Sequence, residues 1–191
     1  MLEGLLVDLV PLDREFSDLN HKWFNSEAGY WGSAGDRKIV TRAKMDRWFE
    51  EWHQEMDAGM RHFEFGVMTK ERVLIGNFGV SQFWPVHRTA SVGFIIGEPA
   101  YWSRGYGTDA LLLLVEYLFD WLDLRRIWLG TMSLNMRVQR LMEKCGFTFE
   151  ARLRDAFVAD GSYVDELVYG LLREEWPGRA AMVERLGLKP K

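Results

Sequence analysis

The sequence predicts a single domain of the mixed α/β (α+β) class, with helices packed on a mixed sheet. Its 191 residues suit one domain with one sizeable core. Strand and helix patterns follow the order β-α-α-β-β-β-α-β-α-β-β, which is not the regular alternation of a doubly wound sheet. The chain shows no internal repeat and no linker rich in Pro, Gly or Ser. Residues 1–176 are therefore expected to form the domain, and residues 177–191 a short C-terminal helical tail.

The first elements follow from the spacing of apolar residues. Phe16, Leu19 and Trp23 recur at helical spacing, and the three glycines of the next segment indicate a loop. The expected elements here are a strand at residues 5–12, a helix at 13–24, a loop at 25–38 and a second amphipathic helix at 41–57.

Three strand patterns come next, at about residues 62–69, 73–84 and 89–96. The short turn K-E-R joins the first two, which indicates an antiparallel meander.

The C-terminal half adds two helices and three strands. A helix at 108–122 is apolar almost all round, which predicts that it is buried. The strand at 126–132 is expected to pair in parallel with an earlier strand across that helix. The remaining expected elements are a helix at 135–145 that ends before Gly146, where a left-handed cap is wanted, and strands at 148–157 and 163–171.

A glycine loop between a strand and a helix carries the main functional signal. Residues 93–110 read G-F-I-I-G-E-P-A-Y-W-S-R-G-Y-G-T-D-A. Gly105 and Gly107 let the backbone approach a ligand closely. The unpaired amides and the dipole at the start of the helix form an anion site, to which Arg104 adds a positive charge. A pyrophosphate is the expected guest.

A dinucleotide site is the rival interpretation of this loop. Gly105, Gly107 and Ala110 satisfy G-x-G-x-x-A, the fingerprint of that site. However, eight residues separate Ile96 from the first glycine, and the strand at 127–132 ends without the acid that would hold a ribose. An NADP-binding oxidoreductase is therefore the weaker hypothesis.

The loop and two later blocks resemble the GNAT superfamily of N-acetyltransferases, and within it the branch of ribosomal-protein alanine N-acetyltransferases. The second block, N-M-R-V-Q-R-L-M-E-K-C-G-F, spans residues 135–147. The third, D-G-S-Y-V-D-E-L-V-Y-G-L-L-R-E-E-W, spans residues 160–176. The resemblance covers roughly residues 5–176 in the expected order.

The resemblance implies the GNAT fold, a mostly antiparallel mixed seven-stranded sheet with a splayed parallel strand pair and flanking helices. It also implies that acetyl-CoA binds in the splay, with its pantetheine arm on the main chain of residues 94–96 and its pyrophosphate on the amides of residues 103–108. Asn135 would lie near the thioester. Arg137, Arg140 and Lys144 either approach the 3′-phosphate or face water. The cofactor-binding residues expected in this way are Phe94, Ile95, Ile96, Trp102, Ser103, Arg104, Gly105, Tyr106, Gly107, Thr108, Asn135 and Arg140.

Direct acyl transfer needs a base for the amine proton, a donor for the carbonyl oxygen and help for the leaving thiolate. A backbone N–H of the 94–96 strand is the candidate oxyanion donor. The side chains that many relatives use are absent, since Gly130, Val138 and Met142 stand at those positions. Carboxylates elsewhere are then the candidate bases. These are Glu98, ranked first because it follows the splayed strand, Asp160 and Asp165.

Composition narrows the partners. The net charge of −4 disfavours a nucleic-acid backbone. No stretch is long and apolar enough to span a bilayer, and the N-terminus lacks the basic start of a signal peptide. The single cysteine, Cys145, lies on the inner stripe of its helix and is expected to be a core thiol. The four histidines show no metal-ligand spacing, so no metal is expected. We expect a cytoplasmic protein, as a monomer or a homodimer.

The sequence therefore predicts an enzyme that moves acetyl from acetyl-CoA to a primary amine. The acceptor is either a protein N-terminal α-amine or a small-molecule amine. The alternative from another class is a module that binds coenzyme A or an acyl-CoA without turnover.

Overall fold

A computed structural model describes residues 1–37, 39–57 and 62–190. Lys38, the last residue of the predicted 25–38 loop, and Lys191, the last residue of the predicted tail, lie outside this description. The same holds for the side chains of residues 52–53 and 55–57.

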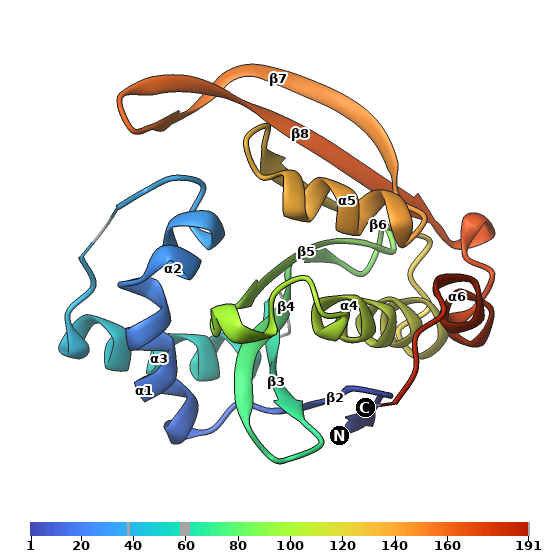
Figure 1. Cartoon of the computed structure of the whole chain (residues 1–191), viewed down its shortest axis with the longest axis horizontal. Helices are drawn as coiled ribbons and strands as arrows, with labels where there is room; N and C mark the ends of the chain where they lie inside the picture. The colour runs from blue at the N-terminus through green and yellow to red at the C-terminus, as the bar shows by residue number, and fades with distance from the viewer. Residues whose placement is uncertain (38, 58–61, 191) are drawn as a thin grey trace.

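The described residues form one mixed sheet of eight strands in the order β1-β2-β3-β4-β5-β6-β8-β7 (Figure 1). All neighbouring strands pair antiparallel except β5 and β6, which are parallel. The strands are β1 (Leu2–Glu3), β2 (Val7–Pro11), β3 (Phe63–Thr69), β4 (Leu74–Trp84), β5 (Thr89–Ile96), β6 (Arg126–Met132), β7 (Thr148–Ala159) and β8 (Ser162–Leu172). This architecture confirms the predicted fold class, and it is not the doubly wound sheet of a dinucleotide enzyme.

The eighth strand was not predicted. β1 has two residues and pairs with β2 through Leu2 and Leu9. A strand of that length carries no alternation that a sequence pattern can detect. The other seven strands lie close to their predicted ranges, and β5 and β6 match theirs.

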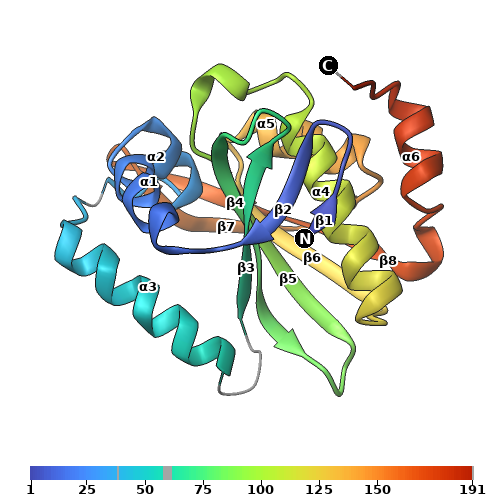
Figure 2. The same cartoon turned by 90° about the horizontal axis from the view of Figure 1, so that it is seen from below.

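Helices cover both faces of the sheet (Figure 2). On one side lie α1 (Arg14–Phe24), α2 (Glu27–Gly32) and α3 (Arg42–Asp57), and on the other α4 (Tyr106–Glu116) and α6 (Arg179–Leu186). A π-helical turn, Tyr117–Trp121, extends α4. The remaining elements are α5 (Met136–Lys144), which lies beside β7 and β8, and two 3₁₀ turns, η1 (Pro99–Tyr101) and η3 (Arg173–Glu175).

The predicted loop at 25–38 is wrong in part, because it contains α2. Ser26 caps this helix, since its hydroxyl accepts a hydrogen bond from the Ala28 amide at 3.2 Å. The glycines that indicated a loop are packing positions. A Cβ at Gly29 would lie 2.3 Å from the Phe24 carbonyl oxygen, and one at Gly32 would lie 3.2 Å from the Ile95 side chain. Close approach to the end of α1 explains Gly29, and close approach to β5 explains Gly32.

The C-terminal helix α6 belongs to the packed body. Met182 is fully buried in the main hydrophobic core. Arg179 pairs at 3.1 Å with Asp109 of α4, whose side chain is completely buried. The other Asp109 oxygen accepts the Leu6 amide at 2.7 Å. One carboxylate thus links α6 and α4 to the start of β2. The helix in residues 177–191, which was expected as a tail, therefore packs against the domain.

The parallel pair β5–β6 is splayed. The two strands pair only through residues 89–91 and 126–128, although β5 continues to Ile96 and β6 to Met132. Beyond Ser91 the main-chain groups of β5 that would face β6 have no strand partner on that side. The sheet therefore opens into a wedge at the carboxyl ends of these two strands.

Candidate active site

A cavity of about 480 Å³ fills this wedge, and we call it the splay cavity. Its walls come from α2, β5, the loop before α4, the start of α4, β6 and α5. Its lining residues are Ala28, Trp31, Gly32, Phe94, Ile95, Ile96, Tyr101, Trp102, Ser103, Gly105, Gly107, Thr108, Leu129, Thr131, Asn135, Arg137, Val138, Arg140, Leu141 and Lys144. Its volume lies within the ~300–1,000 Å³ range of sites that enclose a small-molecule ligand.

The N-terminus of α4 opens into the splay cavity. Gly105 precedes the helix with φ 94°, a left-handed conformation that glycine adopts without strain. No side chain caps the helix, so its first amides are left for another acceptor. A Cβ at Gly107 would meet only Ile96, at 3.6 Å. The backbone is thus open to a close-lying anion where the sequence predicted one.

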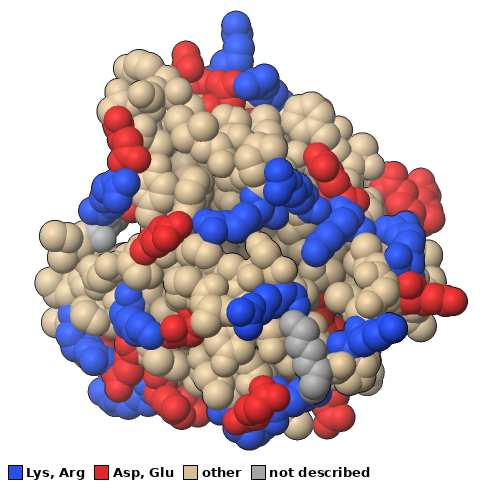
Figure 3. All heavy atoms as spheres, viewed as in Figure 1, with Lys and Arg blue, Asp and Glu red and all other residues tan. Residues whose placement is uncertain are grey.

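Three cations of α5 face the same cavity, namely Arg137, Arg140 and Lys144. Figure 3 shows basic side chains in a band over the region of this helix. The Arg137 guanidinium lies 4.0 Å from the centre of the Trp102 ring and 5.4 Å from that of Trp31. It therefore bridges the glycine loop and α2 across the cavity. This arrangement adds positive potential to the anion site at α4.

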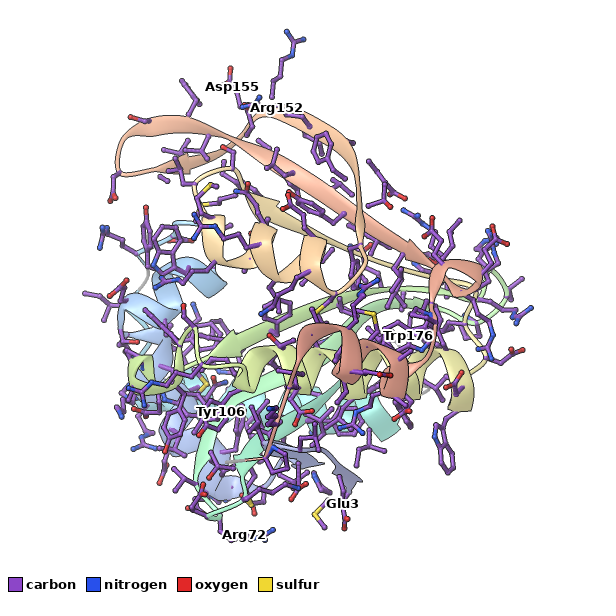
Figure 4. The ribbon with its side chains drawn as sticks, turned by 45° about the vertical axis from the view of Figure 1, so that its right-hand side comes forward. Glu3, Arg72, Tyr106, Arg152, Asp155 and Trp176 are labelled. Atoms are coloured by element: carbon purple, nitrogen blue, oxygen red, sulfur yellow. The ribbon has the colours of Figure 1, made fainter. Side chains whose placement is uncertain are left out.

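Ten of the twelve residues predicted to bind the cofactor line this cavity. The two exceptions are Arg104 and Tyr106. Arg104 is exposed at the protein surface. The Tyr106 ring packs edge-on against Tyr101 at 5.0 Å, at the start of α4 (Figure 4). At these two positions the side-chain role predicted from the sequence stays a prediction.

Three of the predicted residues also make structural hydrogen bonds. Asn135 caps α5, since its side-chain oxygen accepts from the Val138 amide at 3.3 Å. The Ile96 carbonyl oxygen accepts from the Trp102 indole at 2.6 Å, which fixes the Trp102 ring in the cavity wall.

A second chamber of about 210 Å³ adjoins the splay cavity on the other side of β5. The two cavities share Gly32, Phe94 and Ile95. The second chamber is lined by Phe24, Gly32, Ser33, His62, Glu64, Asn77, Gly79, Val80, Ser81, Gly93, Phe94 and Ile95. It is below the usual size for enclosing a whole ligand, so it fits one end of a molecule that reaches in toward β5.

Glu64 is the carboxylate of the second chamber. Its side chain is 13% exposed. It accepts a hydrogen bond from the Asn77 amide at 2.8 Å and lies 3.1 Å from the His62 ring nitrogen. The sequence analysis missed Glu64 because it sits mid-strand in β3, far along the chain from the glycine loop.

The structure corrects the choice of Glu98 as the first candidate base. Its carboxylate accepts hydrogen bonds from Lys22 at 2.5 Å and from the Trp23 indole at 2.8 Å. Burial raises the pKa of Glu98, but these two hydrogen bonds and the Lys22 charge outweigh it, so the net pKa is lowered. Glu98 is not among the residues that line either cavity. It ties β5 to α1.

The other two candidate bases are also engaged elsewhere. Asp160 accepts hydrogen bonds from Arg37, at 2.7 Å, and from Tyr30. Asp165 accepts from Arg152 at 2.5 Å and from the Asp155 amide. In Figure 4, Arg152 and Asp155 lie on the outer side of the β7–β8 hairpin, away from the splay cavity.

The three positions that depart from the usual family residues behave differently. Met142 is fully buried in the core and Val138 lines the splay cavity. At Gly130 the space of a side chain is filled by the Glu166 carboxylate, which comes from β8. A carboxylate thus lies beside position 130 after all, but it comes from β8 and not from β6.

Cys145 is buried, and burial raises the pKa of its thiol to about 12. That matches the expected core thiol. Among the described residues no group of three or more His, Cys, Asp or Glu side chains could hold a metal ion, and no helix is long and apolar enough to cross a membrane.

These features define an acyl-transferase type of domain, and comparison with known proteins identifies the family. The model of the acetyltransferase (GNAT) domain matches residues 7–148. The chain therefore belongs to the GNAT acetyltransferases.

Two curated relatives illustrate the family. The chain is 30% identical over 150 residues to the Probable N-acetyltransferase YjcK of Bacillus subtilis (strain 168), covering 76% of each protein. It is 27% identical over 161 residues to the spermidine N(1)-acetyltransferase of Vibrio cholerae serotype O1, covering 76% of this chain and 92% of the relative.

A solved structure supports the fold. The spermidine N-acetyltransferase from Vibrio cholerae in complex with CoA and spermine superposes with a TM-score of 0.78 at 22% identity. The match covers 89% of this chain and 97% of that one.

Proposed function

We propose that this protein transfers an acetyl group directly from acetyl-CoA to a primary amine, which is either a protein N-terminal α-amine or a small-molecule amine. The observation that carries the proposal is the splay cavity itself. It combines an uncapped helix N-terminus with three cations and continues past β5 into a separate chamber.

In this proposal the splay cavity takes the cofactor. The amides at the start of α4 hold the pyrophosphate, and Arg137, Arg140 and Lys144 bind the remaining phosphate charge. The unpaired side of β5 from residue 92 to residue 96 takes the pantetheine arm, much as an added strand would. A backbone N–H of the same stretch stabilises the oxyanion of the tetrahedral intermediate.

The second chamber takes the acceptor. Amine and thioester then meet across residues 93–95 of β5, which both cavities share in part. Holding the two reactants at this point supplies part of the rate by positioning alone. A relative named spermidine N(1)-acetyltransferase supports a primary amine as acceptor.

Isothermal titration calorimetry with acetyl-CoA and with NADPH tests the cofactor. We expect binding of acetyl-CoA and none of NADPH. A protein that fails to bind acetyl-CoA contradicts the proposal.

Turnover is tested by mixing protein and acetyl-CoA with spermidine, free amino acids and an alanine-initiated peptide while following free thiol. We expect at least one amine to raise thiol release above the hydrolytic background. If acetyl-CoA binds but no amine raises thiol release above the background, the chain is a coenzyme A-binding module without turnover.

A further inference from the structure

The second chamber contains a carboxylate whose side chain lies over glycine positions of the sheet. Glu64 of β3 lies directly opposite Gly79 of β4, which in turn lies opposite Gly93 of β5. A Cβ at Gly79 would be 2.5 Å from the Glu64 Cγ, so the Glu64 side chain crosses the sheet where Gly79 leaves room. A Cβ at Gly93 would meet nothing within 4 Å. The carboxylate therefore points along a glycine floor toward β5.

Asn77 holds this carboxylate and has an unused acceptor of its own. Its side-chain nitrogen donates to Glu64, and its side chain is 8% exposed. Its Oδ1 is buried and receives no hydrogen bond from the described residues. The chamber thus presents the Glu64 carboxylate, which Asn77 holds in place, to a guest with N–H donors.

A neutral primary amine matches this carboxylate. It has N–H groups to donate and a lone pair that is left to attack. The chamber reaches β5 at Gly93, Phe94 and Ile95, and the last two also line the splay cavity. An amine that donates to Glu64 therefore faces the stretch of β5 assigned to the thioester.

We propose, on the basis of the proposed function, that Glu64 is the catalytic base for the acceptor amine and that Asn77 positions Glu64. The amine nitrogen attacks the thioester carbonyl carbon, and the C–N bond forms. The nitrogen becomes positively charged and passes one proton to Glu64, directly or through one water. The C–S bond then breaks with its electron pair on sulfur. The thiolate takes a proton from solvent, and Glu64 returns its own to solvent, so the products are the amide and free coenzyme A.

Two other carboxylates provide matched comparisons. Glu166 occupies the space beside Gly130 on β6, the opposite wall of the splay. Glu98 is hydrogen-bonded to Lys22 and Trp23 behind β5. Each of these two carboxylates has a Gln variant that removes its charge with little change of shape, and neither lines the second chamber.

The test compares Glu64→Gln with Glu98→Gln and Glu166→Gln in the full chain, with acetyl-CoA and the best amine of the panel. For Glu64→Gln we expect kcat to fall at least about 100-fold and the acidic limb of the kcat–pH profile to disappear. The Kd for acetyl-CoA, measured by calorimetry, should stay within about twofold of the wild-type value, since Glu64 does not line the splay cavity. The other two variants should keep both kcat and the acidic limb.

Glu64→Asp serves if Glu64→Gln does not fold, as judged by circular dichroism and melting temperature. It keeps a base but draws it back by one methylene, so we expect kcat to fall about tenfold with the acidic limb retained.

The inference is overturned if Glu64→Gln, or Glu64→Asp in its place, turns over at the wild-type rate, or if the limb is lost in Glu166→Gln or Glu98→Gln instead. In those cases the acetyltransferase proposal stands. A wild-type protein that binds acetyl-CoA but acetylates no amine removes the proposed function, and this inference with it.

Discussion

The two cavities on either side of β5 are built in different ways. The splay cavity is made largely by main chain, with an open strand edge, a glycine loop and a helix N-terminus. The second chamber is made by side chains that converge from separate strands, with Glu64 on β3 and Asn77 on β4 beside Gly93 on β5. This difference agrees with our proposal that the splay cavity takes the donor and the second chamber takes the acceptor.

The strongest test of this division is Gly107→Trp. Gly107 faces the splay cavity with free space around it, so an indole would fill the pyrophosphate position without clashing inside the fold. We expect affinity for acetyl-CoA to fall about 1,000-fold, or ~4 kcal/mol, with the melting temperature little changed. Calorimetry measures the affinity, and unchanged binding would remove the anion site from α4.

Gly93→Leu is the matched change in the second chamber. A leucine there would project into open space on the acceptor side of β5. We expect kcat/KM for the amine to fall about tenfold, equal to ~1.4 kcal/mol, while the Kd for acetyl-CoA stays within about twofold. If Gly93→Leu instead weakens acetyl-CoA and spares the amine, the assignment of the two cavities is reversed.

Glu98→Gln should affect stability and leave both cavities unaffected. Its charge-assisted hydrogen bonds to Lys22 and Trp23 contribute about 1–2 kcal/mol to the free energy of unfolding at neutral pH. Because the folded-state pKa of Glu98 is lowered, that stability is present above the unfolded pKa of about 4.3 and is lost as the pH falls through the folded value. Urea unfolding at pH 7 and pH 3 should show the variant's deficit at pH 7 and little of it at pH 3. A deficit that is equal at both pH values would contradict the ionic role.

Arg137→Ala tests the bridge over the splay cavity. The guanidinium stacks between Trp102 and Trp31, and exposed cation–π contacts contribute about 0.5–1 kcal/mol each. We expect acetyl-CoA to bind three- to tenfold more weakly, with Arg137→Lys intermediate, because lysine keeps the charge but loses the planar stack. If the alanine variant binds acetyl-CoA as tightly as wild type, the Arg137 contacts with Trp31 and Trp102 only pack α2, α5 and the glycine loop together and do not contribute to binding.

The Cys145 thiol should not react with thiol reagents in the native protein. With burial raising its pKa to about 12, its thiolate is scarce at pH 8. Ellman's reagent should release no chromophore from the folded chain within the assay time and one equivalent after unfolding in guanidinium. Rapid reaction of the native protein would contradict the core placement. The expected inertness also allows the same reagent to follow coenzyme A release.

The sequence predicted those parts of the site that depend on neighbours along the chain. The loop before α4, the strand β5 and the cap Asn135 are each defined by local pattern, and ten of the twelve predicted residues line the splay cavity. The prediction failed where the role of a glycine or an acid depends on a contact with a residue outside its own local pattern. Gly29 and Gly32 indicated a loop although they pack α2 against Phe24 and Ile95, and Glu98 was ranked as a base although Lys22 and Trp23 occupy it.

The sequence by itself therefore determined the family and pointed to the proposed donor loop, because a strand, a glycine loop and a helix start are contiguous and their amides are placed by backbone conformation alone. Only the tertiary structure decided which carboxylate lines the second chamber. Glu64, Asn77 and Gly93 are brought together by the register of three strands, and that register depends on packing across the whole sheet.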